Sequence, residues 1–207
     1  MKKNKISKKW INKQKRDIFV RESKKQGYRS RSAFKLIEID QKFRFLSNSK
    51  FLLDLGSTPG GWSQVASKKI KNGKVLSVDT REMLPINNAT FLKGDLTNLG
   101  TQNNIINFFN NKIDIVLSDM AANTTGNKEL DSIRTGNLCL NAIEFSRKIL
   151  NYKGVFISKF FMGSIFAEIR IKAKKLFKEV LIFKPKSSRK ESREIYIFCK
   201  YLRISND

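Results

Sequence analysis

Short apolar runs alternate with longer amphipathic stretches along the chain from residue 28 onward. The runs are rich in Leu, Ile, Val and Phe, as buried strands are, and the longer stretches repeat apolar residues at helical spacing. This alternation favours an α/β domain built on a mostly parallel sheet. The predicted strands are 52–55, 74–79, 89–94, 113–119, 154–161, 178–185 and 193–201, and the predicted helices are 30–43, 62–66, 103–111, 130–150 and 167–177.

The last two predicted strands are joined by the basic segment KSSRKESR, residues 186–193. This connection is too short to hold a crossover helix, so the final strand is expected to run antiparallel to the strand before it. An antiparallel strand begins at the edge of the sheet where the parallel strands end. The topology therefore predicts that Glu194 lies at that edge.

The segment LLDLGSTPGGWSQVA, residues 52–66, gives the first indication of a ligand site. A strand, a glycine-rich turn and a helix together form the cradle in which nucleotide-type ligands bind. Pro59 bends the chain, and Gly60 and Gly61 would let its backbone approach a ligand closely. A βα turn without a ligand can have the same pattern, so this segment alone leaves both interpretations open.

Charged residues stand at the ends of several predicted strands. Asp79 ends the strand after the glycine turn, where a carboxylate can hydrogen-bond a ribose diol, and Asp95 and Asp119 follow two further strands. Lys159 lies within an apolar strand, so its charge must reach the open end of the strand or be paired. Because ligands of open α/β sheets bind at the carboxyl edge, all of these side chains are expected to converge there with Glu194.

The first 27 residues differ from the rest of the chain because they are polar and strongly basic. We therefore divide the chain into an N-terminal extension, residues 1–27, and one domain, residues 28–207. The extension is expected to be a solvated tail, with contact to phosphates as the alternative. In the helix at 30–43, Ser30 and Ser32 are the N-cap candidates. Lys35 lies on the face opposite the apolar residues, where it is either a solvated lysine or a cation presented to a site.

Composition supports a polyanionic partner. The chain has 42 Lys and Arg against 18 Asp and Glu, a formal net charge of +24 and a pI near 10.2. Nucleic acid is the expected partner, although abundant Lys, Asn and Ile also reflect a general compositional bias. No histidine and only Cys139 and Cys199 occur, so no metal site is expected. No apolar run reaches the ~20 residues of a membrane span, and a reduced cytoplasm is the expected compartment.

Two nucleotide-related chemistries fit the sequence poorly. A P-loop needs Lys followed by Ser or Thr after its last glycine, and here Trp62 and Ser63 follow Gly61. A short-chain dehydrogenase needs Tyr and Lys four apart on a helix. Tyr196 and Lys200 have that spacing within a predicted strand, where they would lie about 13 Å apart.

Four motifs resemble those of the FtsJ/RrmJ-type family of ribosomal RNA ribose 2′-O-methyltransferases. They are DLGSTPGGWSQ, SDMAAN, the KxF pattern beginning at Lys159, and KPKSSRKESREIY, in that order. The resemblance, which runs from about residue 24 to the C-terminus, implies a Rossmann-like S-adenosylmethionine-dependent methyltransferase fold. That fold has a seven-stranded mostly parallel sheet with one antiparallel strand and helices on both faces. By position, the family's catalytic tetrad would be Lys35, Asp119, Lys159 and Glu194, and its S-adenosylmethionine-binding residues would be Gly56, Gly60, Trp62, Asp79, Asp95 and Asp119.

The resemblance implies 2′-O-methylation of the ribose of a uridine in large-subunit ribosomal RNA. It also implies that the protein is a monomer and that its partner is this RNA or the large ribosomal subunit. Methylation of tRNA or cap ribose, and a non-catalytic RNA-binding assembly factor, are the alternatives. Lys159 would take the proton of the 2′-hydroxyl or orient that hydroxyl. Two departures from the family pattern, Ala122 where proline is usual and Met162 where glutamine is common, are expected to alter a loop or a substrate contact and to leave the chemistry intact.

Overall fold

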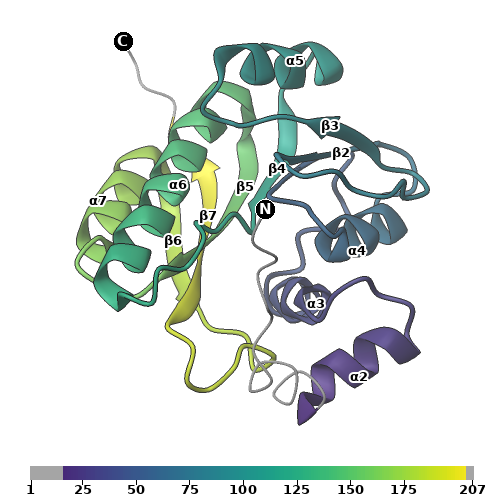
Figure 1. Ribbon diagram of the computed structural model, residues 1–207. Helices are drawn as coiled ribbons and strands as arrows, with labels where there is room; N and C mark the ends of the chain where they lie inside the picture. Colours follow the sequence, from purple (N-terminus) through teal and green to yellow (C-terminus); the bar gives the residue numbers. More distant parts are fainter. Residues whose placement is uncertain (1–15, 204–207) are drawn as a thin grey trace, which may run out of the picture.

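The computed structural model describes residues 16–203 of the chain. A seven-stranded sheet runs through its centre in the order β3-β2-β1-β4-β5-β7-β6, and β7 is antiparallel to both of its neighbours while all other pairs are parallel. Helices cover both faces (Figure 1). The predicted fold, a mostly parallel seven-stranded sheet with one antiparallel strand, is confirmed.

The predicted strands and helices are all present. The strands are β1 Phe51–Leu55, β2 Lys74–Asp79, β3 Thr90–Lys93, β4 Ile113–Ser118, β5 Leu150–Phe161, β6 Phe177–Phe183 and β7 Glu194–Leu202. The helices are α2 Ile18–Lys25, α3 Ser32–Phe43, α4 Gly61–Lys69, α5 Leu99–Phe109, α6 Lys128–Ile149 and α7 Phe166–Leu176. β5 begins earlier than expected because it follows α6 directly.

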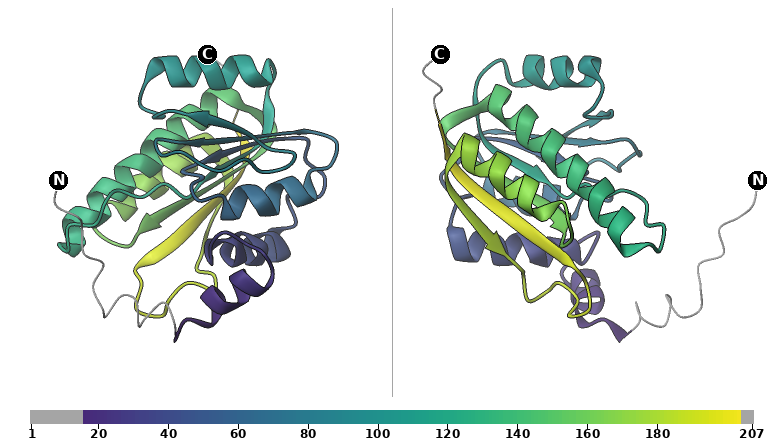
Figure 2. Two further views of the ribbon diagram at one scale, coloured as in Figure 1. Left: turned by 45° about the vertical axis from the view of Figure 1, so that its right-hand side comes forward. Right: turned by 90° about the vertical axis from the view of Figure 1, so that its left-hand side faces the viewer.

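The sheet separates two apolar cores. On one face, α5, α6 and α7 pack through buried residues such as Ile105, Ile143 and Ile169, and Figure 2 shows α6 and α7 lying alongside each other there. On the other face, α3 and α4 pack through residues such as Leu36 and Val65. The apolar runs of the central strands are buried because both faces of the sheet are covered there, whereas the edge strands β3 and β6 are partly exposed.

The antiparallel pairing of β5 with β7 brings the end of one strand to the start of the other. Lys159 pairs with Tyr196, and Phe161 pairs with Glu194. This register places Glu194 at the edge where β5 ends, as the short connection between the last two strands predicted.

Two local predictions were wrong. The end of the N-terminal extension is helical, since α2 begins after the N-cap Asp17 and packs on α3 through Phe19 and Phe34, whose ring centroids are 5.6 Å apart. The prediction of a solvated tail therefore fails for this segment, and residues 1–15 lie outside the described part. Ser30 and Ser32 do not cap α3, because the N-cap is Arg31 and the two hydroxyls hydrogen-bond to each other.

Within residues 16–203, no helix is both long and apolar enough to cross a bilayer. The same part of the chain holds no group of three or more Cys, Asp or Glu residues arranged to bind a metal ion. Cys139 and Cys199 are free thiols buried in α6 and β7.

Candidate active site

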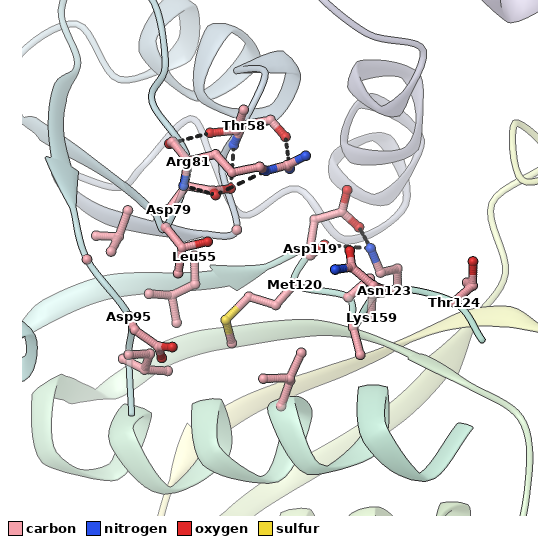
Figure 3. A pocket seen from close by; sticks show the side chains of 18 residues that line it. Leu55, Thr58, Asp79, Arg81, Asp95, Asp119, Met120, Asn123, Thr124 and Lys159 are labelled. Atoms are coloured by element: carbon pink, nitrogen blue, oxygen red, sulfur yellow. Dashed lines mark hydrogen bonds and ion pairs between the residues drawn. The ribbon is translucent and has the colours of Figure 1, made fainter. Parts of the chain in front are cut away.

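A cavity of about 720 Å³ opens at the carboxyl ends of β1, β2, β4 and β5. We call it the strand-end cavity. Figure 3 shows Asp79 and Asp95 on one side of it and Asp119 and Lys159 on the other. Its lining residues are Leu55, Gly56, Thr58, Val78, Asp79, Thr80, Arg81, Gly94, Asp95, Leu96, Asp119, Met120, Ala121, Ala122, Asn123, Thr124, Leu138 and Lys159.

The glycine-rich turn forms one wall of the cavity, and neighbouring segments of the protein come very close to it. Gly56 has a φ of +73°, and a Cβ added there would lie 2.7 Å from the backbone nitrogen of Met120. A Cβ added at Gly61 would lie within 3 Å of the hydroxyls of Ser30 and Ser32. At these two positions glycine is required by contact with the segment after β4 and with the start of α3, and not only by a ligand.

The carboxylates on the Asp79 side are held by nearby backbone. Asp79 accepts hydrogen bonds from the backbone N–H of Thr58 and of Arg81, both at 2.9 Å. Asp95 accepts from the backbone N–H and the hydroxyl of Thr97, both at 2.8 Å. These local bonds fix the direction of each carboxylate toward the cavity.

The predicted tetrad consists of two lysine–carboxylate pairs. Lys159 Nζ lies 2.8 Å from Asp119 Oδ1 and also donates to the backbone carbonyl of Asp119. Lys35 Nζ lies 2.7 Å from each carboxylate oxygen of Glu194. Lys35 is 9% exposed and paired with Glu194, so the interpretation as a solvated lysine is wrong, whereas its presentation to a site stays a prediction. We call these four residues the tetrad.

The charges of the tetrad act on one another across the two pairs. Burial acts to raise the pKa of the Asp119 carboxyl, but the ammonium groups of Lys159 and then Lys35 outweigh it and hold that pKa below its ordinary value. Tyr196, buried beside them, donates its hydroxyl to Asp119 at 3.2 Å. Burial, reinforced by Asp119 and Glu194, raises the pKa of the Tyr196 phenol, so it stays a hydrogen-bond donor at neutral pH.

The family described as FtsJ-like methyltransferase matches residues 28–202 of the chain. Ribosomal RNA large subunit methyltransferase E from Pelagibacter ubique (strain HTCC1062) is 55% identical over 203 residues, which cover 98% of this chain and all of that protein. The chain belongs to the FtsJ-like methyltransferase family. The same family resemblance was indicated by its motifs.

Two solved structures extend the comparison. One is described as a ribosomal RNA methyltransferase from Plasmodium falciparum; it has a TM-score of 0.76 and 36% identity, and the match covers 84% of this chain and 98% of that one. The other is described as a methyltransferase from Streptococcus mutans in complex with SAH; at 15% identity, with a TM-score of 0.52 and coverage of 80% and 97%, it shows a shared fold.

In this FtsJ-like chain, the sequence-predicted residues occupy three kinds of position. Gly56, Asp79, Asp95, Asp119 and Lys159 line the strand-end cavity. The Lys35–Glu194 pair lies beside it and is linked to it electrostatically through Asp119, whereas Gly60 and Trp62 do not line it.

The Trp62 indole packs in the core on the α3 side, where it is 2% exposed and its ring centroid lies 5.6 Å from that of Tyr196. Its Nε1–H donates to the carbonyl of Ser32 at 2.9 Å. Gly60 is the N-cap of α4. The predicted roles of these two residues in donor binding stay predictions, and the geometry restricts any contribution of Trp62 to its backbone or to support of the turn.

Sequence reasoning missed several residues of the site. Tyr196 was considered only in a dehydrogenase pattern, although its alternation with Glu194 in a strand places both side chains on one face. Met120 and Arg81 follow Asp119 and Asp79 and line the cavity. Their positions near strand-end aspartates are the signal that could have identified them.

Proposed function

We propose that this protein transfers a methyl group from S-adenosylmethionine to the ribose 2′-hydroxyl of a uridine in large-subunit ribosomal RNA. We further propose that it acts as a monomer in the cytoplasm. The observation that carries the proposal is the juxtaposition of the strand-end cavity with a buried Lys-Asp-Lys-Glu tetrad. The name of the Pelagibacter relative supports ribosomal RNA as substrate.

The cavity fits the methyl donor in size and chemistry. Its volume of about 720 Å³ is within the range of roughly 300–1,000 Å³ that is usual for small-molecule sites. Asp79 and Asp95 offer carboxylate acceptors for ribose hydroxyls or an amine, and Leu55, Val78 and Leu96 offer apolar contact for a base. When bound there, S-adenosylmethionine supplies an electrophilic methyl group on a sulfonium.

The hydrogen bonds of Lys159 suit a proton acceptor. A neutral amine has two N–H groups and one lone pair. As the ammonium that pairs with Asp119, Lys159 directs two N–H donors to the side chain and to the backbone carbonyl of Asp119. Release of its third proton to solvent before the reaction would leave the lone pair of the neutral amine in the remaining position, so each methyl transfer requires one such release. A 2′-hydroxyl next to that lone pair could lose its proton to Lys159 as its oxygen attacks the methyl group.

The other tetrad residues hold Lys159 and the substrate in place. Asp119 fixes the direction of the Lys159 nitrogen and stabilises the ammonium that forms after proton transfer. Lys35, fixed by Glu194, is a second donor close enough to act on Asp119. We propose that Lys35 and Glu194 hydrogen-bond the ribose so that its 2′-oxygen lies in line with the methyl group.

The proposal is tested by incubating the protein with methyl-labelled S-adenosylmethionine and, separately, tRNA, capped RNA, protein-free large-subunit ribosomal RNA and intact large subunits. The expected result is label in ribosomal RNA, at a 2′-O-methyluridine identified by nuclease digestion and mass spectrometry. Label in tRNA or cap structures alone would assign a different substrate. Donor binding without transfer to any RNA, or no donor binding, would support a non-catalytic RNA-binding protein.

A further inference from the structure

A second concave surface lies where α2, the start of α3 and the loop between β6 and β7 meet. Figures 1 and 2 show that this loop, residues 184–193, reaches α2 from the far end of the chain. We call this surface the α2 groove. Its lining residues are Arg16, Asp17, Ile18, Phe19, Arg31, Lys186, Ser188, Arg189, Lys190 and Glu191.

Ion pairs and backbone hydrogen bonds hold the walls of the groove. Asp17, whose side chain is 10% exposed, pairs with Arg31 at 3.0 Å and with Arg189 at 3.1 Å. Glu38 on α3 accepts from the backbone N–H groups of Lys186 and Ser187. The loop is therefore fixed against α2 and α3 before any ligand binds, which lowers the entropic cost of binding.

The groove carries a net positive charge, because its cations outnumber its carboxylates. Five cations line it against two carboxylates, and Arg16, Lys186 and Lys190 are exposed. In the walls, Nε of Arg31 and Nη2 of Arg189 have no hydrogen-bond partner among the described residues. These two atoms are buried, so the exposed cations Arg16, Lys186 and Lys190 are the groups that a ligand can reach, and their surplus positive charge favours an anionic ligand.

Apolar surface lies between these cations. Ile18 is 67% exposed, and Phe19 lines the same groove with the Arg31 guanidinium 5.7 Å from its ring centroid. Cations that follow a backbone, combined with apolar or aromatic surface for bases, are typical of surfaces that bind single-stranded nucleic acid.

One hydrogen bond connects the groove to the tetrad. Ser188 lines the groove and donates its hydroxyl to Glu194 Oε1 at 2.9 Å, and Glu194 pairs with Lys35. A strand of RNA in the groove would therefore lie next to the nucleotide at the tetrad and would extend away from the strand-end cavity.

We propose that the α2 groove binds a single-stranded segment of the substrate RNA that flanks the methylated nucleotide, with backbone phosphates on Arg16, Lys186 and Lys190. The inference rests on the proposed RNA methylation and adds the path of the RNA and a role for the end of the N-terminal extension. The β6–β7 loop would then position the substrate, because contacts to phosphates fix the position of the RNA strand on the protein without reading its bases.

The test compares two double variants with equal changes of charge. Lys186→Ala/Lys190→Ala removes two exposed cations of the groove. Lys174→Ala/Lys175→Ala removes two exposed cations at the end of α7, on the opposite face of the sheet. Thermal unfolding and titration with S-adenosylmethionine check that both variants fold and keep the donor site.

Binding of a protein-free large-subunit ribosomal RNA fragment is then measured by filter retention at several salt concentrations. The groove variant is expected to bind about tenfold more weakly or worse. The slope of the logarithm of affinity against the logarithm of salt concentration should become shallower by about 1.4, because each removed cation would otherwise neutralise one phosphate of a single strand, at about 0.7 per phosphate. Its KM for RNA should rise, and the α7 variant should behave like the wild type.

Three results would separate the hypotheses. If wild-type protein methylates ribosomal RNA and the two variants bind it equally, the groove is not part of the RNA path. If the groove variant loses binding to intact subunits but not to protein-free RNA, the occupant is a ribosomal protein and the inference is wrong. If the wild type methylates no RNA, the proposed function fails, while the binding comparison still decides whether the groove binds RNA.

Discussion

The carboxylates of the strand-end cavity and those of the tetrad are held in different ways. Asp79 accepts hydrogen bonds from the backbone N–H groups of Thr58 and Arg81, and Asp95 accepts from that of Thr97. Arg81 and Thr97 each lie two residues after the carboxylate that they contact. Glu194, in contrast, is paired with Lys35 across 159 positions of sequence. The bonds from Arg81 and Thr97 form within a turn, and the bond from Thr58 to Asp79 requires only that β1 and β2 are paired. The Lys35–Glu194 pair requires that α3 and β7 are already packed together.

Under the proposed function, this difference separates donor binding from methyl transfer. Backbone donors stabilise a carboxylate without supplying a group that exchanges protons, so the Asp79 side of the site suits recognition of a donor. The tetrad contains lysine side chains, which can donate and accept protons, and its carboxylates fix their direction. Changes on the two sides should therefore have different kinetic effects.

Replacing Lys159 is expected to have the largest effect on turnover. Lys159→Ala removes the proposed proton acceptor, and loss of a positioned acid–base group costs about 10²- to 10⁴-fold in rate. Donor binding should stay within about twofold, because the Asp79 side is unchanged. Single-turnover methylation and calorimetric titration measure the two quantities. Lys153→Ala, an exposed position earlier in β5, is the control. Substantial turnover by the Lys159 variant would remove Lys159 from the mechanism.

Replacing Glu194 is expected to have the largest effect on stability. Glu194→Ala leaves the Lys35 ammonium, whose side chain is 11% exposed, without its carboxylate, which should lower the free energy of unfolding by about 3 kcal/mol. Urea unfolding measures the change, with the exposed Glu168→Ala as control.

The double variant Lys35→Met/Glu194→Leu tests the reason for this loss. Because it removes both charges, it should be more stable than Glu194→Ala alone, although it should remain impaired in methylation. If the double variant is the less stable of the two, the cost comes from lost packing and not from an unpaired buried charge.

Replacing Asp79 should weaken donor binding and spare the chemistry. Asp79→Asn keeps the size of the side chain but removes its charge and replaces one of the two oxygens that accept from backbone N–H groups by an NH₂ donor. We expect about tenfold weaker binding of S-adenosylmethionine, which corresponds to about 1.4 kcal/mol. Turnover at saturating donor should change less than threefold. The exposed Glu82→Gln is the matched control, since its side chain is 73% exposed. A fall in saturated turnover with unchanged donor affinity would place Asp79 with the tetrad instead.

The same contrast explains what the sequence could predict. The central strands were predicted well because their apolar runs are buried on both faces. The register that brings Glu194 to Phe161 follows from the short connection before β7. Asp79 and Asp95 could be placed because each lies at or just after the end of a strand. These features depend on local pattern and on the rules of sheet topology.

Features that depend on packing between distant segments could not be predicted from pattern alone. The apolar pattern predicted Lys35 on the opposite face of α3, but Lys35 is buried together with Ile39, one turn later, and is paired with Glu194. Asp17 resembles any residue of a basic tail until Arg31 and Arg189 are brought to it. Trp62 fits a donor-site motif, but the proximity of α3 places its indole in the core.

The departure at Met162, the first residue after β5, should have the smallest effect. Met162 is 39% exposed and does not line the strand-end cavity, and its backbone N–H donates to the carbonyl of Arg193, a bond that does not depend on the side chain. Met162→Gln should therefore change stability by less than about 0.5 kcal/mol and the rate of methylation by less than about twofold. Steady-state methylation of the RNA identified as substrate measures this. A large rise in KM for RNA, with donor affinity unchanged, would show that the side chain after β5 contacts RNA and would extend the substrate surface from the tetrad toward the loop after β5.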